Sequence, residues 1–232
     1  MTRKLFWEDM YMKEFAAKVT SVDGTQIVLD QTAFNPRGGG LVGDTGWINE
    51  AKVVDTVKGP ADSISHLLET PASFSVGQDV KGTLDWERRH KIMRMHTSAH
   101  LLSAIFNKRT GALITGNQIE AEKSRIDFSL EDFDRERMLS YCGEANEAIT
   151  KNAPVKTYFM KREEALKIPG ITKLATPAPP DVQELRIVEI EGYDLQADGG
   201  VHIKNLSEIG KIDPIKFENK GKSNRRLYFT LP

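Results

Sequence analysis

The hydrophobic pattern of this chain changes its period near residues 85–88, and this change limits the possible folds more than any other feature. Before it, short runs rich in β-branched and aromatic residues alternate with turn residues, whereas after it apolar residues recur every three or four positions. The first pattern is typical of short strands and the second of amphipathic helices. We therefore predict an α+β protein, with a small β-barrel domain over residues 1–86 and a second domain of antiparallel sheet and helices over residues 87–232.

The strand-like runs before the boundary are short and closely spaced. Asp23-Gly24 separates the first two runs and is a signal for a tight hairpin turn. Strands are expected at residues 15–22, 25–29, 46–48, 51–57, 64–68 and 80–86. Many short strands at this spacing favour a small barrel.

The second part opens with the clearest helical pattern. One face of a helix over residues 87–106 would carry Ile92, Met95, Ala99, Leu102 and Phe106. A second amphipathic helix is expected to begin with the capping sequence at 129–132 and to end before residue 154, which is a proline. The remaining expected elements are a short helix at 163–167, a stiff exposed loop at 176–180, and strands at 185–190, 214–218 and 226–230.

Composition narrows the class of protein further. The chain has 232 residues, 28% of them charged, a formal net charge of −1 and one cysteine. It has no apolar run long enough to cross a bilayer, no apolar core of a signal peptide near its N-terminus, and no pair of cysteines for a disulfide. These features predict a cytoplasmic globular protein without a membrane partner, and they indicate no protein partner. Cys142 lies on the apolar stripe of its helix and is interpreted as a core residue.

The sequence contains two pairs of potential metal ligands, and the two members of each pair stand four residues apart. His96 and His100 would share one face of the first helix, and Asp198 and His202 flank two glycines that let the backbone approach a ligand closely. Each pair alone has an ordinary explanation, as solvated helix histidines or as a glycine turn before a strand. Together they favour a metal site, whereas His66 and His90, which have no such partner, are interpreted as structural.

Two further features admit both a binding role and a structural role. The glycine-rich segment 35–46 lies between β runs, so it lacks the strand-to-helix context of a phosphate-binding loop. It is either a flexible loop or a binding loop. Basic residues crowd the start of the first helix and the C-terminal hairpin, where they form either solvated faces or contacts to a phosphate backbone.

Four stretches together resemble a known family. They are FNPRGGGLVGDTG (34–46), LDWERRHKIMRMHTSAHLLSAIF (84–106), TGNQIEAEKSRIDFSL (115–130) and LQADGGVHIKNLSEIGKI (195–212). In this order they resemble the free-standing alanyl-tRNA editing proteins of the AlaX family, which are related to the editing domain of alanyl-tRNA synthetase. The length resembles that of the medium-sized members.

The resemblance implies hydrolysis of the ester that links a wrong amino acid, chiefly serine, to tRNA(Ala). It also implies one zinc ion per chain, held by positions that match His96, His100 and His202. Asp198 stands where the family usually has cysteine, and the glycine loop departs from the family at Asn35, Arg37 and 41–42. Carboxylate and thiolate carry the same charge and both bind Zn²⁺, so Asp198 is either the fourth ligand or a general base beside a His₃–water site. The zinc would activate water, polarise the carbonyl or orient the substrate.

The resemblance and the local pattern together supply candidate residues. Asp198 and Gln118 are the catalytic candidates, and polar groups that would recognise a serine hydroxyl are sought at Thr32, Asn117 and Gln118. The glycines expected to bind substrate with Thr32 and Asn117 are Gly38, Gly39 and Gly40. The candidates for contact with tRNA are Arg88, Arg89, Lys91, Arg94, Lys222, Arg225 and Arg226.

Two other functions are compatible with parts of the sequence. A non-catalytic tRNA-binding homologue would explain an altered ligand set at Asp198. A zinc hydrolase of small esters or peptides has less support, because residues 97–99, Thr-Ser-Ala, stand where an HExxH motif has its glutamate.

Overall fold

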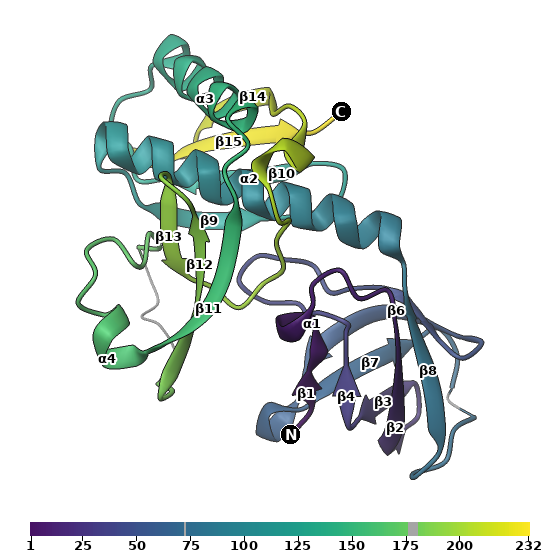
Figure 1. Cartoon of the computed structure of the whole chain (residues 1–232). Helices are drawn as coiled ribbons and strands as arrows, with labels where there is room; N and C mark the ends of the chain where they lie inside the picture. Colours follow the sequence, from purple (N-terminus) through teal and green to yellow (C-terminus); the bar gives the residue numbers. More distant parts are fainter. Residues whose placement is uncertain (72, 176–180) are drawn as a thin grey trace. The chain divides into compact units, whose positions relative to one another are not determined.

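The computed structural model describes residues 1–71, 73–175 and 181–232, and its course is shown in Figure 1. The loop expected at 176–180 lies outside the described residues. The chain divides into two compact units, Met1–Ile92 and Met93–Pro232, here called the barrel unit and the C-terminal unit. Each is described separately below.

Six antiparallel strands close the barrel. In the order in which they pair, they are β2 (Glu14–Asp23), β3 (Gln26–Leu29), β7 (Ile64–Leu68), β6 (Ala51–Lys58), β5 (Gly46–Ile48) and β8 (Asp79–Leu84). The unit also contains β1 (Arg3–Lys4), which pairs in parallel with β4 (Gln31–Thr32), the short helix α1 (Leu5–Glu8) and the 3-10 turn η1 (Pro60–Asp62). The predicted hairpin at Asp23-Gly24 is confirmed, because Asp23 pairs with Gln26 and Gly24 has a φ of 57°.

Alternating burial along these strands builds the barrel core. In β2 the side chains of Phe15, Ala17 and Val19 point inward, while their neighbours are exposed. They pack with Ile27 and Leu29 of β3 and with apolar residues of the other strands. Closing the sheet leaves these six strands without a free edge.

Helix α2 (Trp86–Thr110) begins earlier than the sequence suggested. Trp86, expected to end a strand, is the first helical residue because Asp85 caps the helix, its Oδ1 accepting from the N–H of Arg88 at 3.2 Å. The side chain of Arg88 also donates to the carbonyl of Gly43. The first turns of α2 are therefore tied to the barrel, and the two units divide inside this helix rather than at its start.

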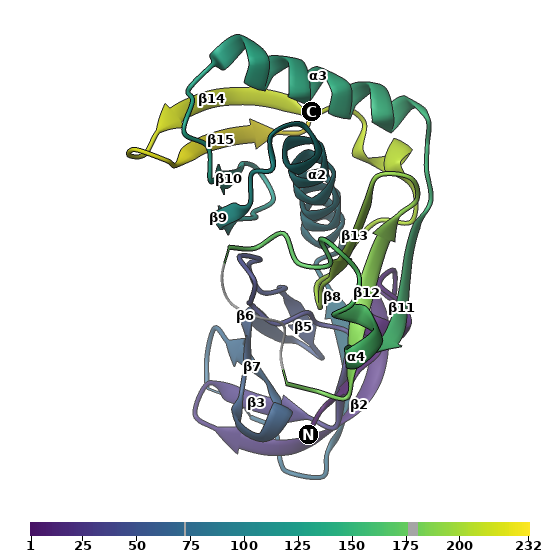
Figure 2. The same cartoon turned by 90° about the vertical axis from the view of Figure 1, so that its left-hand side faces the viewer.

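In the C-terminal unit, α2 lies between two antiparallel sheets, as Figure 2 shows by looking along the helix. The four-stranded sheet has the order β14 (Asp213–Asn219), β15 (Arg225–Thr230), β10 (Ser124–Phe128) and β9 (Ile114–Gln118). The three-stranded sheet has the order β11 (Val155–Lys161), β12 (Glu184–Ile190) and β13 (Asp194–Ala197), with α4 (Arg162–Ala165) following β11 and the 3-10 turn η2 (Leu206–Ile209) nearby in sequence.

Because a sheet lies on each side of α2, the helix is buried on other faces as well as on the predicted apolar face. Phe106 stacks on Phe128 of the four-stranded sheet, with ring centroids 4.2 Å apart, and His100 contacts Asp194 of the other sheet. Polar residues of α2 are therefore buried too, and the hydroxyls of Thr97 and Ser103 donate to carbonyls four residues earlier.

Helix α3 (Arg135–Thr150) packs its predicted apolar face, which includes Met138 and Cys142, into the core. The predicted start at residues 129–132 is wrong. Asp134 is the cap, because its side chain accepts from the N–H of Arg137 at 3.0 Å, whereas the hydroxyl of Ser129 accepts from Leu113.

The predicted α+β class, with a barrel followed by antiparallel sheet and helices, is confirmed. Among the described residues, no helix is both long and apolar enough to span a membrane.

Candidate metal centre

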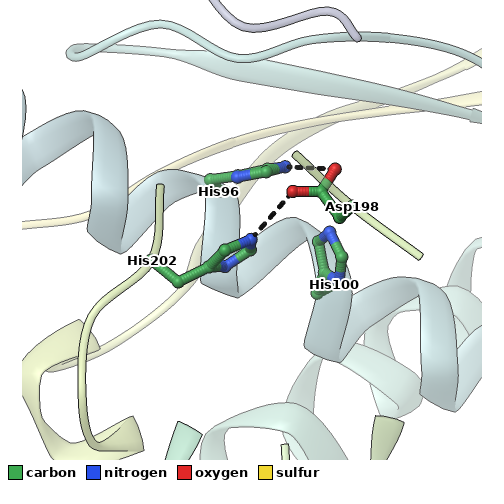
Figure 3. Close-up of side chains that lie close together, drawn as sticks. All are labelled: His96, His100, Asp198 and His202. Carbon is green, nitrogen blue, oxygen red and sulfur yellow. Dashed lines mark hydrogen bonds and ion pairs between the residues drawn. The ribbon is translucent and has the colours of Figure 1, made fainter. Parts of the chain in front are cut away.

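Four side chains that could bind a metal converge in the C-terminal unit (Figure 3). His96 and His100 lie one turn apart on α2, and Asp198 and His202 lie on the segment that follows β13. One ligand atom from each residue can be chosen so that all four atoms lie within 4.8 Å of one another. The structure therefore brings together the two pairs that the sequence singled out.

The rings of His96 and His100 are each held by a protein acceptor at Nδ1. The carbonyl of Val201 lies 3.2 Å from Nδ1 of His96, and Oδ2 of Asp194 lies 3.0 Å from Nδ1 of His100. Because carbonyl and carboxylate oxygens only accept, both imidazoles carry their proton on Nδ1 when neutral. Nε2 of each ring then has a lone pair available to a metal.

His202 follows the same rule through a hydroxyl. Its Nδ1 lies 3.1 Å from Oγ1 of Thr97, whose own proton goes to the carbonyl of Met93 at 3.0 Å. The hydroxyl then accepts from Nδ1–H of His202, which leaves Nε2 as the acceptor. This Nε2 lies 3.2 Å from Oδ1 of Asp198.

A tight backbone turn positions Asp198. Its Oδ1 accepts from the N–H of Gly200 at 2.7 Å, and Arg186 donates to the carbonyls of Asp198 and Gly200 at 3.1 and 2.8 Å. A Cβ on Gly200 would lie 2.7 Å from Cε1 of His96, closer than real side chains approach. The glycine is therefore required where the backbone passes the histidine ring.

Burial governs the charges in this cluster. It lowers the pKa of His96 to about 4, although the charge of Asp198 opposes this, and it lowers the pKa of His202 well below its usual value. Burial also opposes ionisation of Asp198, but its charge interaction with His96 and its hydrogen bond with His202 hold the pKa of Asp198 well below the usual range. The cluster thus combines a carboxylate with neutral imidazoles at His96 and His202.

The donor set suits a divalent cation. The acceptor atom Nε2 of His202 lies 3.2 Å from the acceptor Oδ1 of Asp198, and Nε2 of His96 lies 3.9 Å from Oδ2. Acceptors that face one another inside a protein repel unless a proton or a cation lies between them. Three imidazole nitrogens and one carboxylate oxygen form a common ligand set for Zn²⁺ and related ions.

Thr32 belongs to the barrel unit. Its buried hydroxyl lies 2.8 Å from Nε2 of His66, and Nδ1 of His66 lies 3.3 Å from the carbonyl of Ile27. Nδ1 therefore carries the proton, and Thr32 donates to Nε2. These contacts agree with the structural interpretation of His66, whereas substrate binding by Thr32 remains a prediction.

The glycine-rich segment also belongs to the barrel unit. Gly39 and Gly40 have φ values of 61° and 90° and form a tight turn closed by two backbone hydrogen bonds between Gly38 and Leu41. Positive φ at both central residues explains why glycines stand there. The base of the segment is fixed by the buried carboxylate of Asp44, which pairs with Arg89. Substrate binding by these glycines remains a prediction.

Asn117 and Gln118 are neighbours on β9 and point to opposite faces of the four-stranded sheet. Asn117 pairs with Ile126, whose side chain is buried against the interior, whereas Gln118 pairs with Arg125 on the outer face. Gln118 is exposed and its amide contacts Glu120 and Arg125. The two side chains therefore lie on opposite faces of an edge strand, and the roles of Asn117 in substrate binding and of Gln118 in catalysis remain predictions.

Most of the basic residues predicted to contact tRNA are engaged within the protein. Arg89 is buried with Asp44, and buried Arg225 donates to a set of backbone carbonyls that includes those of Gly221 and Glu131. Arg88 also donates to the Gly43 carbonyl, Arg94 to the carbonyls of Ile209 and Pro232, and Arg226 to Asp127. Lys91 and Lys222 are exposed.

Sequence reasoning missed the residues that support the ligands. Asp194 and Gln196 lie two residues apart on one face of β13, and Asp198 comes two residues later, just after the strand ends, so this spacing of two was a usable signal. Lys173 and Arg186 had no such signal, because their contacts depend on how distant segments meet.

Comparison with known proteins places this fold and site in a class. Residues 5–88 match the family model for class II (A) tRNA synthetases, and residues 185–228 match that for the threonyl and alanyl tRNA synthetase second additional domain. The chain therefore belongs to the class of proteins whose domains are shared with aminoacyl-tRNA synthetases.

Individual relatives narrow the class. The chain is 44% identical over 236 residues to the alanyl-tRNA editing protein AlaX-M of Saccharolobus solfataricus and 46% identical over 244 residues to that of Methanosarcina mazei; both alignments cover the whole chain, with 99% and 97% of the relatives. It is 36% identical over 225 residues to the alanine–tRNA ligase of Sulfurisphaera tokodaii, an alignment that covers 94% of this chain and 25% of the ligase. The chain belongs to the AlaX-M family of alanyl-tRNA editing proteins, as the sequence resemblance predicted.

Proposed function

We propose that this protein is a trans-editing deacylase that hydrolyses the ester between serine and tRNA(Ala), with one zinc ion held by His96, His100, His202 and Asp198. Membership of the AlaX-M family supports the substrate. The observation that carries the proposal is the convergence of these four side chains, because three imidazoles and a carboxylate can each place one ligand atom within 4.8 Å of the others. A divalent cation bound there acts as a Lewis acid toward an ester carbonyl or a water molecule.

The chain's own residues prepare this site for such chemistry. Val201, Asp194 and Thr97 accept from the three Nδ1 atoms and keep every Nε2 directed into the cluster. Arg186 and Gly200 hold the turn that carries Asp198. The protein therefore supplies ligands that its own hydrogen bonds hold in place before the reaction.

Asp198 serves in this proposal as the fourth ligand rather than as a base. Its carboxylate lies among the imidazoles, with Oδ1 held by Gly200 and Oδ2 directed toward His96. Asp198→Ala is expected to lower the zinc content of the purified protein, whereas Asp198→Cys, which restores the usual family residue, is expected to keep zinc. Full zinc retention by Asp198→Ala would instead make Asp198 a candidate base.

Selectivity for serine is proposed to depend on Asn117. It lies on the face of β9 that is turned toward the interior, and its side chain makes no hydrogen bond within the described residues. A polar group that awaits the serine hydroxyl is left unpaired by alanine, which penalises the correct product. Asn117→Ala should lower the ratio of serine to alanine hydrolysis more than Thr32→Val does, since the hydroxyl of Thr32 already donates to His66. An unchanged ratio in Asn117→Ala would exclude this role.

The outer face of the four-stranded sheet is proposed to contact the tRNA backbone together with Lys222, and Lys91 of the barrel unit is a separate candidate contact. The basic side chains of this sheet face are Lys123, Arg125, Lys216, Lys220 and Arg226, against the acids Asp127 and Glu218. Tyr228 lies among them, with Lys123 and Arg226 near its ring. Lys216→Ala with Lys222→Ala should weaken tRNA binding and reduce its salt dependence by about one unit per lost phosphate contact.

The direct test of the function is deacylation of Ser-tRNA(Ala) and Ala-tRNA(Ala) by the purified protein, with and without a chelator. Rapid, chelator-sensitive loss of serine with alanine spared is the expected result. Binding of tRNA without loss of either amino acid would contradict the proposal and favour a non-catalytic tRNA-binding protein.

A further inference from the structure

A buried network behind His100 continues away from the metal cluster. Asp194 is buried, and its Oδ2 accepts from Nδ1 of His100 at 3.0 Å and from Nε2 of Gln196 at 2.7 Å. Its other oxygen, Oδ1, lies 2.5 Å from Nζ of Lys173, which is buried as well. Every oxygen of this carboxylate therefore has a donor.

Gln196 lies close enough to His100 to influence which ring nitrogen of His100 carries the proton. Its Nε2, which donates to Asp194, also lies 3.4 Å from Nδ1 of His100. Without Asp194 this amide could donate to a lone pair on Nδ1, and the imidazole proton would move to Nε2. A protonated Nε2 cannot bind a metal. Asp194 thus engages the amide and keeps the proton on Nδ1.

Lys173 supplies the charge that allows an ionised carboxylate at this depth. A buried carboxylate with no cationic partner is costly, and the Lys173 ammonium lies in direct contact with it. The same residue is bound through its backbone to the start of β9, where its carbonyl accepts from the N–H of Ile114 at 2.7 Å. One residue therefore connects the support of a metal ligand to the strand that carries Asn117.

We propose that Asp194 is a positioning residue that fixes the Nδ1–H tautomer of His100, with Lys173 as its buried counter-ion. The network acts only through His100 and does not touch the reacting atoms. This inference rests on the metal site proposed above and not on the identity of the aminoacyl ester.

The test uses paired substitutions, because removing one member of a buried ion pair leaves the other charge unpaired. The variants are the double substitutions K173M/D194N, which keeps a carbonyl acceptor, and K173M/D194L, which removes it. Asp127→Asn is the matched control, because Asp127 is a buried, ion-paired aspartate of the same unit that contacts none of the clustered histidines.

Two readouts separate positioning from simple support of the fold. In metal-free, ¹⁵N-labelled protein, the imidazole nitrogen shifts report which nitrogen of His100 is protonated, and K173M/D194L should move the proton from Nδ1 to Nε2. The affinity for Zn²⁺, measured by competition with a chelator, should fall by about 10- to 100-fold in the same variant and by less in K173M/D194N. Asp127→Asn should change neither quantity.

The outcomes distinguish this inference from the proposals it rests on. If His100 keeps its Nδ1–H tautomer in K173M/D194L and Zn²⁺ affinity stays within twofold of the unaltered protein, Asp194 has no positioning role. If the unaltered protein binds no Zn²⁺, the metal site itself is refuted, while the tautomer measurement still decides what Asp194 does. Loss of affinity equal to that of Asp127→Asn would indicate only a general loss of stability and overturn the proposal.

Discussion

Each unit of this protein contains a fully buried histidine that is hydrogen-bonded to a threonine, yet the two pairs differ in what they can do. In the barrel, His66 contacts Thr32 through Nε2 and the Ile27 carbonyl through Nδ1, so both ring nitrogens are satisfied by the protein. In the C-terminal unit, His202 contacts Thr97 through Nδ1, and its Nε2 is directed at the Asp198 carboxylate.

The difference between these pairs is a matter of hydrogen-bond direction. Thr32 donates to His66, because the Ile27 carbonyl already fixes the imidazole proton on Nδ1. Thr97 accepts from His202, because its own proton goes to the Met93 carbonyl. The same two residue types therefore build a closed core contact in one unit and a candidate metal ligand in the other. Burial alone does not distinguish a structural histidine from a functional one.

The largest expected effect comes from replacing the histidine in each histidine–threonine pair. His202→Ala should lower Zn²⁺ affinity and the rate of Ser-tRNA(Ala) deacylation by more than about 100-fold, since a ligand lost costs more than a supporting contact. His66→Ala should leave Zn²⁺ affinity unchanged and lower the free energy of unfolding by about 3 kcal/mol, because it opens a cavity in the barrel. Chelator competition and denaturant unfolding measure the two quantities, and a metal-binding defect in His66→Ala would remove the distinction.

A smaller change at the backbone should disturb the cluster nearly as strongly. Gly200→Ala places a Cβ 2.7 Å from Cε1 of His96 and 3.1 Å from Oδ1 of Asp198, so one ligand or the other has to move. We expect Zn²⁺ affinity to fall by about 10- to 100-fold, as for loss of a supporting contact. Titration of the metal-free protein with Zn²⁺ measures this, and an affinity equal to that of the unaltered protein would show that the turn can relax.

His66 should make a separable contribution to the pH dependence of stability. Burial lowers its pKa to about 4 in the folded protein, whereas the unfolded chain has a value near 6.5. The unfolded state therefore binds the proton first, and stability falls as the pH drops from about 6.5 to about 4. His66 should account for a loss of about 2.5 kcal/mol between pH 7.5 and pH 4.5.

Denaturant unfolding of the metal-free protein at both pH values checks this expectation. His66→Gln lacks the titrating ring. Between pH 7.5 and pH 4.5 its free energy of unfolding should therefore fall by about 2.5 kcal/mol less than that of the unaltered protein. Equal falls in the two proteins would mean that other buried groups, and not His66, cause the acid sensitivity.

The smallest expected effect comes from Gly143, which, unlike Gly200, has open space where a side chain would lie. Gly143 lies in the interior of α3, and a Cβ there would have no atom within 4 Å. Gly143→Ala should raise the free energy of unfolding by about 0.5–1 kcal/mol, because alanine loses less backbone entropy in a helix. Thermal unfolding measures the shift, and Zn²⁺ affinity should stay unchanged, in contrast to Gly200→Ala.

Local patterns in the sequence were sufficient to predict much of the fold. The alternation in strands such as β2 and the Asp23-Gly24 turn identified the barrel, and the period of α2 was correct. The errors were at element ends, where Asp85 and Asp134 cap their helices through contacts that compete with other plausible starts. The sequence also could not reveal that a second sheet covers the polar face of α2.

The metal cluster could be proposed from spacing because each pair of ligands lies within one local element. The residues that support the ligands could not be predicted in this way, because Lys173 contacts Asp194 and Thr97 contacts His202 only after distant segments pack. For the same reason, basic residues such as Arg89 and Arg225 resembled surface contacts in the sequence, although their side chains are buried and donate hydrogen bonds within the protein.

The carboxylate of Asp198 gives this cluster a property that a sulfur ligand would remove. Thiolates are oxidised to sulfenic and higher acids, and a metal held by them is released when that happens. None of the four clustered side chains contains sulfur, and the single cysteine, Cys142, is buried in α3 with its thiol pKa raised to about 12 by burial. Peroxide at concentrations that oxidise thiolate ligands is therefore expected to leave these four side chains chemically intact.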